Sequence, residues 1–279
     1  MENGNQRFRN ADVVIISDVH LGTYGCHARE LVVYLRSIQP KVLVLNGDII
    51  DGWQFSKNYW PKSHNEVLVE IMKLISKGTL VYYLTGNHDE MLRRFSDFSM
   101  GNFHLADKLI LNLDGKRAWI FHGDVFDLSV NSGKWLAKIA GKSYDYLILL
   151  NRALNWSLEK LGKEKISLSK SIKAGVKKAV SYIGDFEETA ALHAISQKYD
   201  YVICGHIHQA QKRIITRDGR TVMYLNSGDW VENLTALEYH KGEWTVYQYI
   251  EESSVIPPAT KEKRKNQTEG AFDFTLNTI

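Results

Sequence analysis

The chain has 279 residues, 44% of them hydrophobic, and a formal net charge of +3, which allow one large or two small globular domains and select no partner by charge alone. Residues 1–7 contain no apolar signal-peptide core, and no apolar run approaches the ~20 residues of a membrane-spanning helix, so we expect neither export nor membrane spanning. The two cysteines are too few for a disulfide framework, which favours a reducing cytoplasm.

Short apolar runs that end abruptly in polar residues recur along the chain. Such runs are typical of buried parallel strands, whose carboxyl ends lie at the sheet edge where ligands bind. The run 42–45 is the most informative, because it leads through Asn46 and Gly47 to Asp48. We expect five strands to bring metal-type ligands to one rim, with Asp48 shared between ions. The other four runs are 13–16 before Asp18 and His20, 80–84 before Asn87 and His88, 119–121 before His122, and 201–204 before His206 and His208.

Strand and helix patterns alternate over residues 12–122, and the last two strands form a hairpin across Asp114-Gly115. From residue 200 onward strand patterns dominate, with hairpin turns at Asp218-Gly219 and Lys241-Gly242. We therefore predict an α/β first half and a mostly antiparallel second half whose sheets face each other. This arrangement is a β-sandwich flanked by helices.

Residues 123–186 interrupt this pattern with helix-period spacing and no strand signal. Apolar residues recur there at steps of three and four in two stretches, 147–161 and 168–183. We predict that this segment is an inserted helical lid and that residues 1–122 and 187–250 form the core. Residues 251–279 are polar and charged, so we expect a flexible tail.

Two features of the predicted lid leave alternatives open. Lysines dominate the charge between residues 160 and 178, which is usual for a solvated helix face but would also suit an anionic substrate. The run 146–150 is apolar nearly all round. It therefore packs on the core, meets a partner subunit or contacts an apolar substrate tail.

The candidate ligands belong to five short motifs. Any one of them is weak evidence, but five in this order, each at a strand end, are hard to explain by chance. They resemble the motifs of the calcineurin-like metallophosphoesterase superfamily, and the resemblance covers residues 12–250. In chain order the motifs are Asp18-Val19-His20, Gly47-Asp48, Gly86-Asn87-His88-Asp89, His122-Gly123-Asp124 and Gly205-His206-Ile207-His208.

The chemistry of phosphate esters explains these residue types. An ester and hydroxide are both anionic near neutral pH, so hydrolysis needs cations that hold the phosphate and lower the pKa of a bound water. The resemblance implies two divalent ions about 3.5 to 4 Å apart that share one carboxylate. Nitrogen and oxygen ligands without thiolate fit Mn, Fe or Zn, and the resemblance favours Mn. The implied ligands are Asp18, His20 and His208 for one ion, Asn87, His122 and His206 for the other, and Asp48 for both.

His88 is not a ligand in the family pattern. Its implied role is to contact the phosphate and protonate the leaving oxygen, which an unperturbed pKa near 6.5 allows. Asp89 and Asp124 are as readily turn residues as functional ones, and Asp51 is expected to cap a helix or turn. The remaining histidines are expected to be structural or solvent-facing: His27, His64, His104, His193 and His240.

The order of the motifs, the helical insertion and Ser227-Gly228-Asp229-Trp230 together resemble the UDP-2,3-diacylglucosamine diphosphatase group of lipid A synthesis. That resemblance implies hydrolysis of a pyrophosphate bond to give UMP and 2,3-diacylglucosamine 1-phosphate. It also implies a cytoplasmic enzyme that is peripheral to the inner face of the membrane and takes a nucleotide-lipid substrate. The best-known form of the group carries Arg where this chain has His88, and the insertion here is long.

Two other functions remain open from the sequence. One is a phosphodiesterase or phosphomonoesterase that acts on a soluble nucleotide or phosphoprotein, and lipid-dependent turnover would separate it from the first reading. The other is a metal-free scaffold on the same fold, which ranks last because all seven ligand positions are retained. We do not expect a nucleic-acid partner, because aromatic and basic residues are not interleaved as stacking would require. The sequence does not indicate an oligomeric state.

Overall fold

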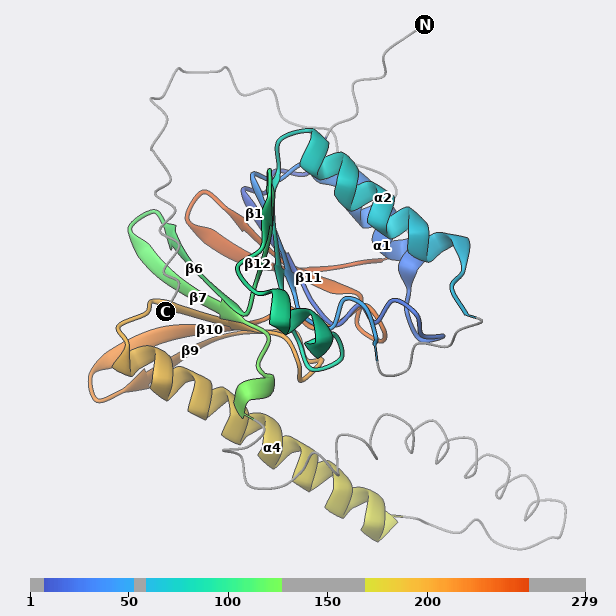
Figure 1. Cartoon of the computed structure of the whole chain (residues 1–279). Helices are drawn as coiled ribbons and strands as arrows, with labels where there is room; N and C mark the ends of the chain where they lie inside the picture. Colours follow the sequence, from blue (N-terminus) through green and yellow to red (C-terminus); the bar gives the residue numbers. More distant parts are fainter. Residues whose placement is uncertain (1–7, 53–58, 127–168, 251–279) are drawn as a thin grey trace, which may run out of the picture. The chain divides into compact units, whose positions relative to one another are not determined.

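The computed structural model describes residues 8–52, 59–126 and 169–250, with only the backbone of residues 169–180 (Figure 1). The chain divides into two compact units, Met1–Asp124 with Ala191–Ile279, and Val125–Ala190. The first predicted lid helix, the apolar run 146–150, most of the predicted basic stretch and the predicted tail lie outside the described residues. Among the described helices, none has both the length and the hydropathy that a membrane span requires.

The first sheet has seven strands, and its centre is parallel as predicted. Its strands β1, β2 and β3 pair side by side in parallel register, and β5 continues the parallel arrangement. Strands β11 and β12 add an antiparallel hairpin next to β1. The order is β12 (Glu243–Gln248), β11 (Thr235–His240), β1 (Val13–Ile16), β2 (Val42–Asn46), β3 (Leu80–Leu84), β5 (Phe103–Ala106) and β4 (Ser99–Met100).

The second sheet has five strands, of which β7, β8 and β10 are parallel. The order is β6 (Lys108–Leu113), β7 (Lys116–Phe121), β8 (Tyr201–Cys204), β10 (Arg220–Asn226) and β9 (Gln211–Arg217). The predicted division into an α/β half and an antiparallel half is therefore wrong in detail. The hairpin β6–β7 from the first half belongs to the second sheet, and the hairpin β11–β12 belongs to the first. Turn residues determine the pairing within a hairpin, but they carry no information about which sheet edge it joins.

Two hydrophobic cores explain why the strands read as unbroken apolar runs. In β2, Leu43 and Leu45 belong to the core under the helices, whereas Val42 and Val44 belong to the core between the sheets. A strand that is covered on both faces needs apolar residues at every position. Helices α1 (Ala28–Ser37) and α2 (Lys62–Ser76) pack side by side on the first sheet (Figure 1). The predicted sandwich with flanking helices is confirmed.

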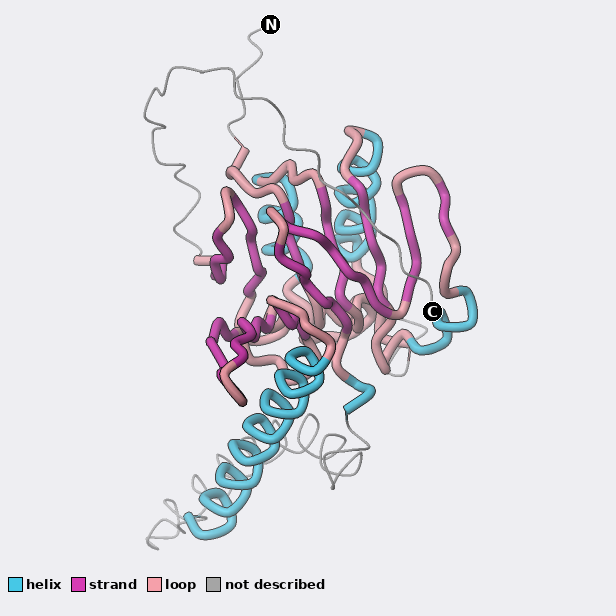
Figure 2. Tube along the Cα trace, turned by 90° about the vertical axis from the view of Figure 1, so that its left-hand side faces the viewer, coloured by secondary structure: helices cyan, strands magenta, loops and turns pink. Residues whose placement is uncertain are grey.

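Helix α4 (Ser169–Ser196) contains the second helix predicted for the insertion, and Figure 2 shows it as one uninterrupted helix. It continues past residue 186, where the sequence suggests that the insertion ends, through the strong helix formers Ala190, Ala191 and Ala194. Its last turns belong to the first unit, where the rings of His193 and Trp119 of β7 lie 4.9 Å apart. Two short 3-10 helices, η1 (Glu90–Phe95) and η2 (Asp124–Phe126), complete the described elements.

Candidate metal centre

The carboxyl ends of strands from both sheets meet at one place. The loops after β1 and β2 are joined by a hydrogen bond from the Asp18 N–H to the Gly47 carbonyl, at 3.1 Å. The loops after β7 and β8 are joined in the same way, from the Gly205 N–H to the His122 carbonyl at 2.9 Å. The Asp18 carboxylate then links the two sheets, because its Oδ2 accepts the His206 N–H at 3.0 Å.

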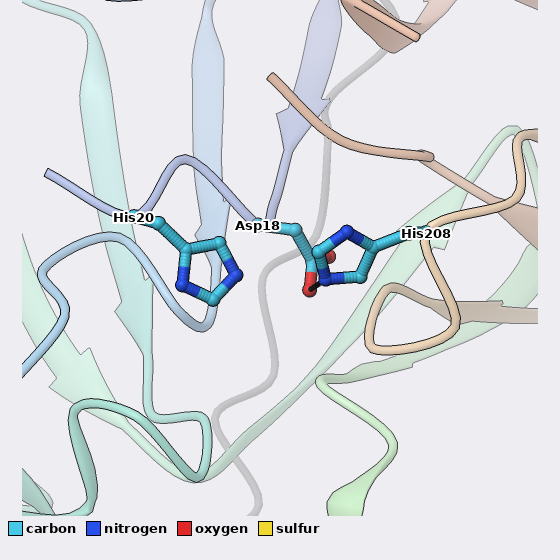
Figure 3. Close-up of side chains that lie close together, drawn as sticks. All are labelled: Asp18, His20 and His208. Atoms are coloured by element: carbon cyan, nitrogen blue, oxygen red, sulfur yellow. Dashed lines mark ion pairs between the residues drawn. The ribbon is translucent and has the colours of Figure 1, made fainter. Parts of the chain in front are cut away.

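Three side chains form a first group with metal-ligand geometry. The ligand atoms of Asp18, His20 and His208 all lie within 4.8 Å of one another, and Figure 3 shows the side chains turned toward a common space. Asp18 Oδ1 lies 3.2 Å from His208 Nε2, and the rings of His20 and His208 are 5.4 Å apart. These are the three residues that the family resemblance assigns to one ion.

A second group contains Asp48, His122 and His206, again with ligand atoms within 4.8 Å of one another. Asp48 Oδ2 lies 3.2 Å from His122 Nε2 and 3.9 Å from His20 Nε2, so this carboxylate stands between the two groups. It also forms a third group with His20 and His88. The position of Asp48 is therefore the one that a shared ligand needs.

Several buried ligand atoms in this region form no hydrogen bond of good geometry with the described residues, although two of them lie 3.2 Å from an ion-pair partner. They are Asp18 Oδ1, His20 Nε2, Asn87 Oδ1 and His122 Nε2. A buried polar atom without a partner costs about 1 to 3 kcal/mol, so a cluster of four calls for a bound group that accepts their lone pairs. The Nδ1 of His122 lies 2.9 Å from the Asn46 carbonyl, which can only accept, so Nδ1 carries hydrogen and Nε2 offers its lone pair in the neutral ring. These atoms fit divalent cations.

The electrostatics of the two groups favour cations as well. Burial opposes ionisation of Asp18, but His208 outweighs burial and lowers the pKa of this carboxyl to about 2. Burial opposes protonation of His208, yet Asp18 raises the pKa of this imidazole to about 9. Asp48 similarly overcomes burial and raises the pKa of His122. A site that holds protons this tightly has a negative potential, and divalent ions bind there by displacing the protons.

The backbone is strained at five of the seven predicted ligands. They have positive φ angles although none is glycine: Asp18 at 51°, His20 at 53°, Asp48 at 51°, His206 at 67° and His208 at 53°. This conformation costs about 1 to 2 kcal/mol per residue and persists where the surroundings enforce it, most often at functional sites. Here the enforcing bonds include the one from the His20 N–H to the Asp48 carbonyl, at 2.9 Å.

Two glycines make room for the carboxylates. A Cβ on Gly86 would overlap Asp48 Oδ1 and lie 2.7 Å from the Asp48 backbone nitrogen. A Cβ on Gly205 would lie 2.6 Å from Asp18 Oδ2. Both positions exclude any side chain, because real Cβ atoms do not approach other atoms so closely.

Comparison with known proteins agrees with this geometry. The family model described as calcineurin-like phosphoesterase matches residues 11–210. The chain belongs to this family. Members normally bind two divalent metal ions, and the chain is a hydrolase with candidate His and Asp groups for such ions.

Relatives of this phosphoesterase share a name. A UDP-2,3-diacylglucosamine hydrolase of Aeromonas salmonicida is 25% identical over 84% of this chain and 92% of its own. One from Neisseria gonorrhoeae is 26% identical over 85% of this chain and 97% of its own. Among solved structures, a Vps29 single mutant from Entamoeba histolytica is 14% identical, covers 85% of this chain and 90% of its own, and has a TM-score of 0.39.

Asp51 has a role in this phosphoesterase that the sequence does not reveal. The sequence suggests a capping role, whereas in the structure its Oδ2 lies 2.9 Å from His88 Nδ1 and 3.2 Å from His20 Nδ1, and its side chain is 1% exposed. Burial lowers the pKa of His88, but the bond to Asp51 and the charge of Asp48 outweigh burial and raise it. Asp51 therefore orients two histidines of the site. The sequence does contain one indication of this role: Asp51 is a second carboxylate, three residues after Asp48 in the same strand-end loop.

The two aspartates left open by the sequence make structural contacts. The Oδ2 of Asp89 accepts the Tyr83 hydroxyl at 2.6 Å and the Ile49 N–H at 3.0 Å, so Asp89 joins the loops after β2 and β3. Burial, reinforced by Asp48, raises the pKa of Asp89. Asp124 accepts a hydrogen bond of 3.0 Å from Arg93.

Ser227-Gly228-Asp229-Trp230 supports both Asp18 and His208. The Trp230 N–H donates to the Asp18 carbonyl at 3.1 Å. Asp229 is fully buried and accepts the N–H groups of Val231 and Asn233 at 2.8 and 3.0 Å. The Asn233 amide in turn donates to the His208 carbonyl at 2.8 Å. This motif therefore holds the backbone at two ligand positions, a role that its sequence alone does not indicate.

The other five histidines have contacts of a structural kind, including the ring contact of His193 with Trp119 given above. His64 is buried and accepts the Gly22 N–H at 3.1 Å, and His240 lies 2.9 Å from Asp12. His104 bonds to Ser99 at 2.9 Å, and His27 lies 3.7 Å from Glu30.

Proposed function

We propose that this hydrolase cleaves the pyrophosphate bond of UDP-2,3-diacylglucosamine to give UMP and 2,3-diacylglucosamine 1-phosphate. Water adds across the bond: one phosphorus gains an oxygen from water, and the bridging oxygen leaves with the other phosphate. The observation that carries this proposal is the pair of ligand groups that meet at Asp48, combined with relatives of that name over most of the chain. A dinuclear site suits a doubly charged diphosphate.

We propose that two ions share Asp48. When bound, divalent ions neutralise the phosphate charge and make water acidic enough to attack near neutral pH. Manganese is the proposed metal, and iron and zinc fit the same nitrogen and oxygen donors. The proposed ligands of one ion are Asp18, His20 and His208, and those of the other are Asn87, His122 and His206.

His88 is the proposed general acid. Its Nδ1 is held by Asp51 at 2.9 Å, and its backbone N–H donates to Asp48 Oδ1 at 2.8 Å, so the ring is oriented and lies beside the shared carboxylate. A hydrogen bond from Nδ1 to a carboxylate leaves Nε2 to give its proton to the leaving oxygen.

The segment 91–100 exposes several apolar side chains. This exposure is consistent with the proposal that the substrate carries a lipid and that the enzyme associates with the inner face of the cytoplasmic membrane. Four large side chains within ten residues, just after Asp89, are each more than half exposed: Met91, Phe95, Phe98 and Met100. Exposed apolar side chains concentrated in one segment are a feature of surfaces that contact lipid or partners. The first of them borders the site, because a Cβ on Gly52, next to Asp51, would lie 3.1 Å from Met91 Cε.

The test compares three substrates with Mn, Fe and Zn in turn: UDP-2,3-diacylglucosamine, a UDP-sugar without acyl chains, and bis(4-nitrophenyl) phosphate. Each buried methylene adds about 0.8 kcal/mol of binding, so even partial cover of the acyl chains gives the lipid a kcat/KM at least about 100-fold above that of the plain UDP-sugar. Equal values for the two nucleotide sugars would contradict a lipid substrate and favour a soluble one.

A further inference from the structure

Tyr24, in the loop that carries His20 after β1, forms an exposed ring stacked on the half-buried Tyr59. Tyr24 is 79% exposed, the highest value among the large apolar and aromatic side chains that the structure describes as exposed. Its ring lies against that of Tyr59, with centroids 3.7 Å apart and planes tilted by 35°. An exposed aromatic ring that is backed by a second ring presents a face on which a planar ligand can stack.

The stack is attached to the loops that carry the site. Tyr24 follows His20 by four residues, and the turn between them is tight: the Thr23 N–H and hydroxyl both donate to the His20 carbonyl, at 3.2 and 2.9 Å. Thr23, which is hydrogen-bonded to His20, is the residue just before Tyr24. Because consecutive Cα atoms are about 3.8 Å apart, the Tyr24 backbone lies close to the backbone of His20, a predicted ligand. Tyr59 belongs to the connection between Asp51 and helix α2.

A buried histidine holds the two loops together. His64, in the first turn of α2, is 1% exposed, and its Nδ1 accepts the Gly22 N–H at 3.1 Å. Its ring meets Tyr59 and Trp60 edge to face, with centroids 5.9 and 5.3 Å away. Burial lowers the pKa of His64, which keeps Nδ1 available as an acceptor. The loop that carries Tyr24 and the segment that carries Tyr59 are therefore fixed relative to each other before any ligand binds.

We propose that Tyr24, backed by Tyr59, is a stacking platform for the nucleobase of the substrate. The assignment rests on the proposed function, in which the phosphate lies at the Asp48 groups and a nucleoside extends from it. The exposed ring of Tyr24, held against Tyr59, offers a π face on which a base can stack, and stacking is tolerant of base identity because every base has a π face. The flexible Met and Phe side chains of residues 91–100 lie on a different loop and suit acyl chains better.

The experiment measures binding of UMP, ribose 5-phosphate and inorganic phosphate to the metal-loaded enzyme. Each is assayed by equilibrium dialysis and by inhibition of bis(4-nitrophenyl) phosphate hydrolysis. Tyr24→Leu keeps an apolar side chain but removes the π face, and it is expected to weaken UMP about ten-fold. Phosphate and ribose 5-phosphate should keep their wild-type constants, and Tyr24→Trp should restore the affinity for UMP. Circular dichroism verifies the fold of each variant.

Tyr199→Leu is the matched control. Tyr199 also stacks on an aromatic ring, that of Trp119 at 5.7 Å, but it precedes β8 and so lies at the amino end of that strand, away from the site. This variant should bind UMP as the wild type does. Unchanged UMP affinity in Tyr24→Leu, or an equal loss for all three ligands, would overturn the platform.

The platform and the proposed function fail in different ways. If Tyr24→Leu selectively weakens UMP while the enzyme does not hydrolyse UDP-2,3-diacylglucosamine, the platform stands and the substrate assignment falls. If the lipid is hydrolysed well and Tyr24→Leu weakens UMP and phosphate alike, the substrate assignment stands and the platform falls.

Discussion

The loops of the metal centre and the hairpin turns use the same unusual backbone conformation for different ends. The φ angle of Asp48 in the site is 51°, and that of Asp114 in the β6–β7 turn is 52°. Both residues have a glycine next to them with positive φ, Gly47 at 82° and Gly115 at 81°. The surroundings differ: a Cβ on Gly115 would meet nothing within 4 Å, whereas one on Gly47 would overlap the His122 ring.

The positive φ angle has a different cause in the hairpin turn and in the metal centre. In the turn, the Asp-Gly pair itself favours the left-handed conformation that a two-residue hairpin needs. In the site, contacts from several strand ends enforce the conformation, because the Asp48 backbone and side chain bond to loops that are distant in sequence. Local sequence therefore explains the positive φ angle in the turn, and tertiary contacts explain it in the metal centre.

The largest expected effect separates the two aspartates directly. Asp48→Ala and Asp114→Ala both place alanine at a φ near 51°, so the two changes carry a similar backbone cost. Asp48→Ala should lower kcat by about 10³-fold or more, since it removes the carboxylate between the two groups. Asp114→Ala should leave kcat unchanged and lower Tm by a few degrees. Near-normal turnover by Asp48→Ala at saturating Mn would mean that the carboxylate is not shared.

His88 tests whether every imidazole of the site is a ligand. His88→Ala should keep the full metal content and lower the rate on the natural ester by about 10²-fold, the usual contribution of a general acid. The loss should be smaller for a 4-nitrophenyl ester, whose leaving oxygen needs no proton. Elemental analysis that finds one metal equivalent missing would make His88 a ligand.

Glycine substitutions extend the comparison to the backbone. Gly86→Ala inserts a methyl group into the Asp48 carboxylate and backbone, so we expect metal affinity to fall about 10-fold or more, as when a ligand's support is removed. Gly115→Ala meets no neighbour and carries only the strain of φ +81°, about 1 kcal/mol. Calorimetry with Mn measures the first, and thermal unfolding measures the second. If both variants bind Mn with equal affinity, the prediction is wrong, because the structure then accommodates the Gly86→Ala methyl group without moving Asp48.

The smallest effect concerns the turn aspartate and pH. The Tyr239 hydroxyl donates to Asp114 at 2.6 Å, and burial together with this bond raises the pKa of Tyr239 above its usual range. A raised folded-state pKa stabilises the protein below about pH 10 and loses that effect as pH rises further. Tyr239→Phe should therefore lower Tm by about 2 to 4 °C at pH 8, where it removes one hydrogen bond. The difference from wild type should shrink at pH 11, and a constant difference would mean that the hydroxyl does not titrate as inferred.

Local patterns were sufficient to predict most of the elements. The apolar runs predict β1, β2, β3, β7 and β8, and the Asp-Gly and Lys-Gly pairs predict three hairpins, each with positive φ at both turn residues. Polar residues at strand ends predict the ligand types, and six of the seven predicted ligands meet where strands of the two sheets end. The strands and hairpins depend on residues that are neighbours in the sequence.

Features that depend on distant partners could not be predicted in the same way. Strand β11 pairs with β1, more than 200 residues earlier, and no local pattern distinguishes that edge from any other. The support that Asp51 gives to His88, and that Asn233 gives to the His208 carbonyl, also depends on contacts between loops that only the folded chain brings together.

The pairing of β1 with β11 has a consequence for synthesis in the cell. Strand β1 delivers Asp18 and His20, yet it remains an open sheet edge until residues 235–240 have been made. The His206 and His208 ligands also emerge late, and chains are synthesised at about 5 to 20 residues per second from the amino end. A nascent chain thus carries five of the seven predicted ligands on unfinished sheets for roughly ten seconds. The complete centre can capture its ions only after nearly the whole core has left the ribosome.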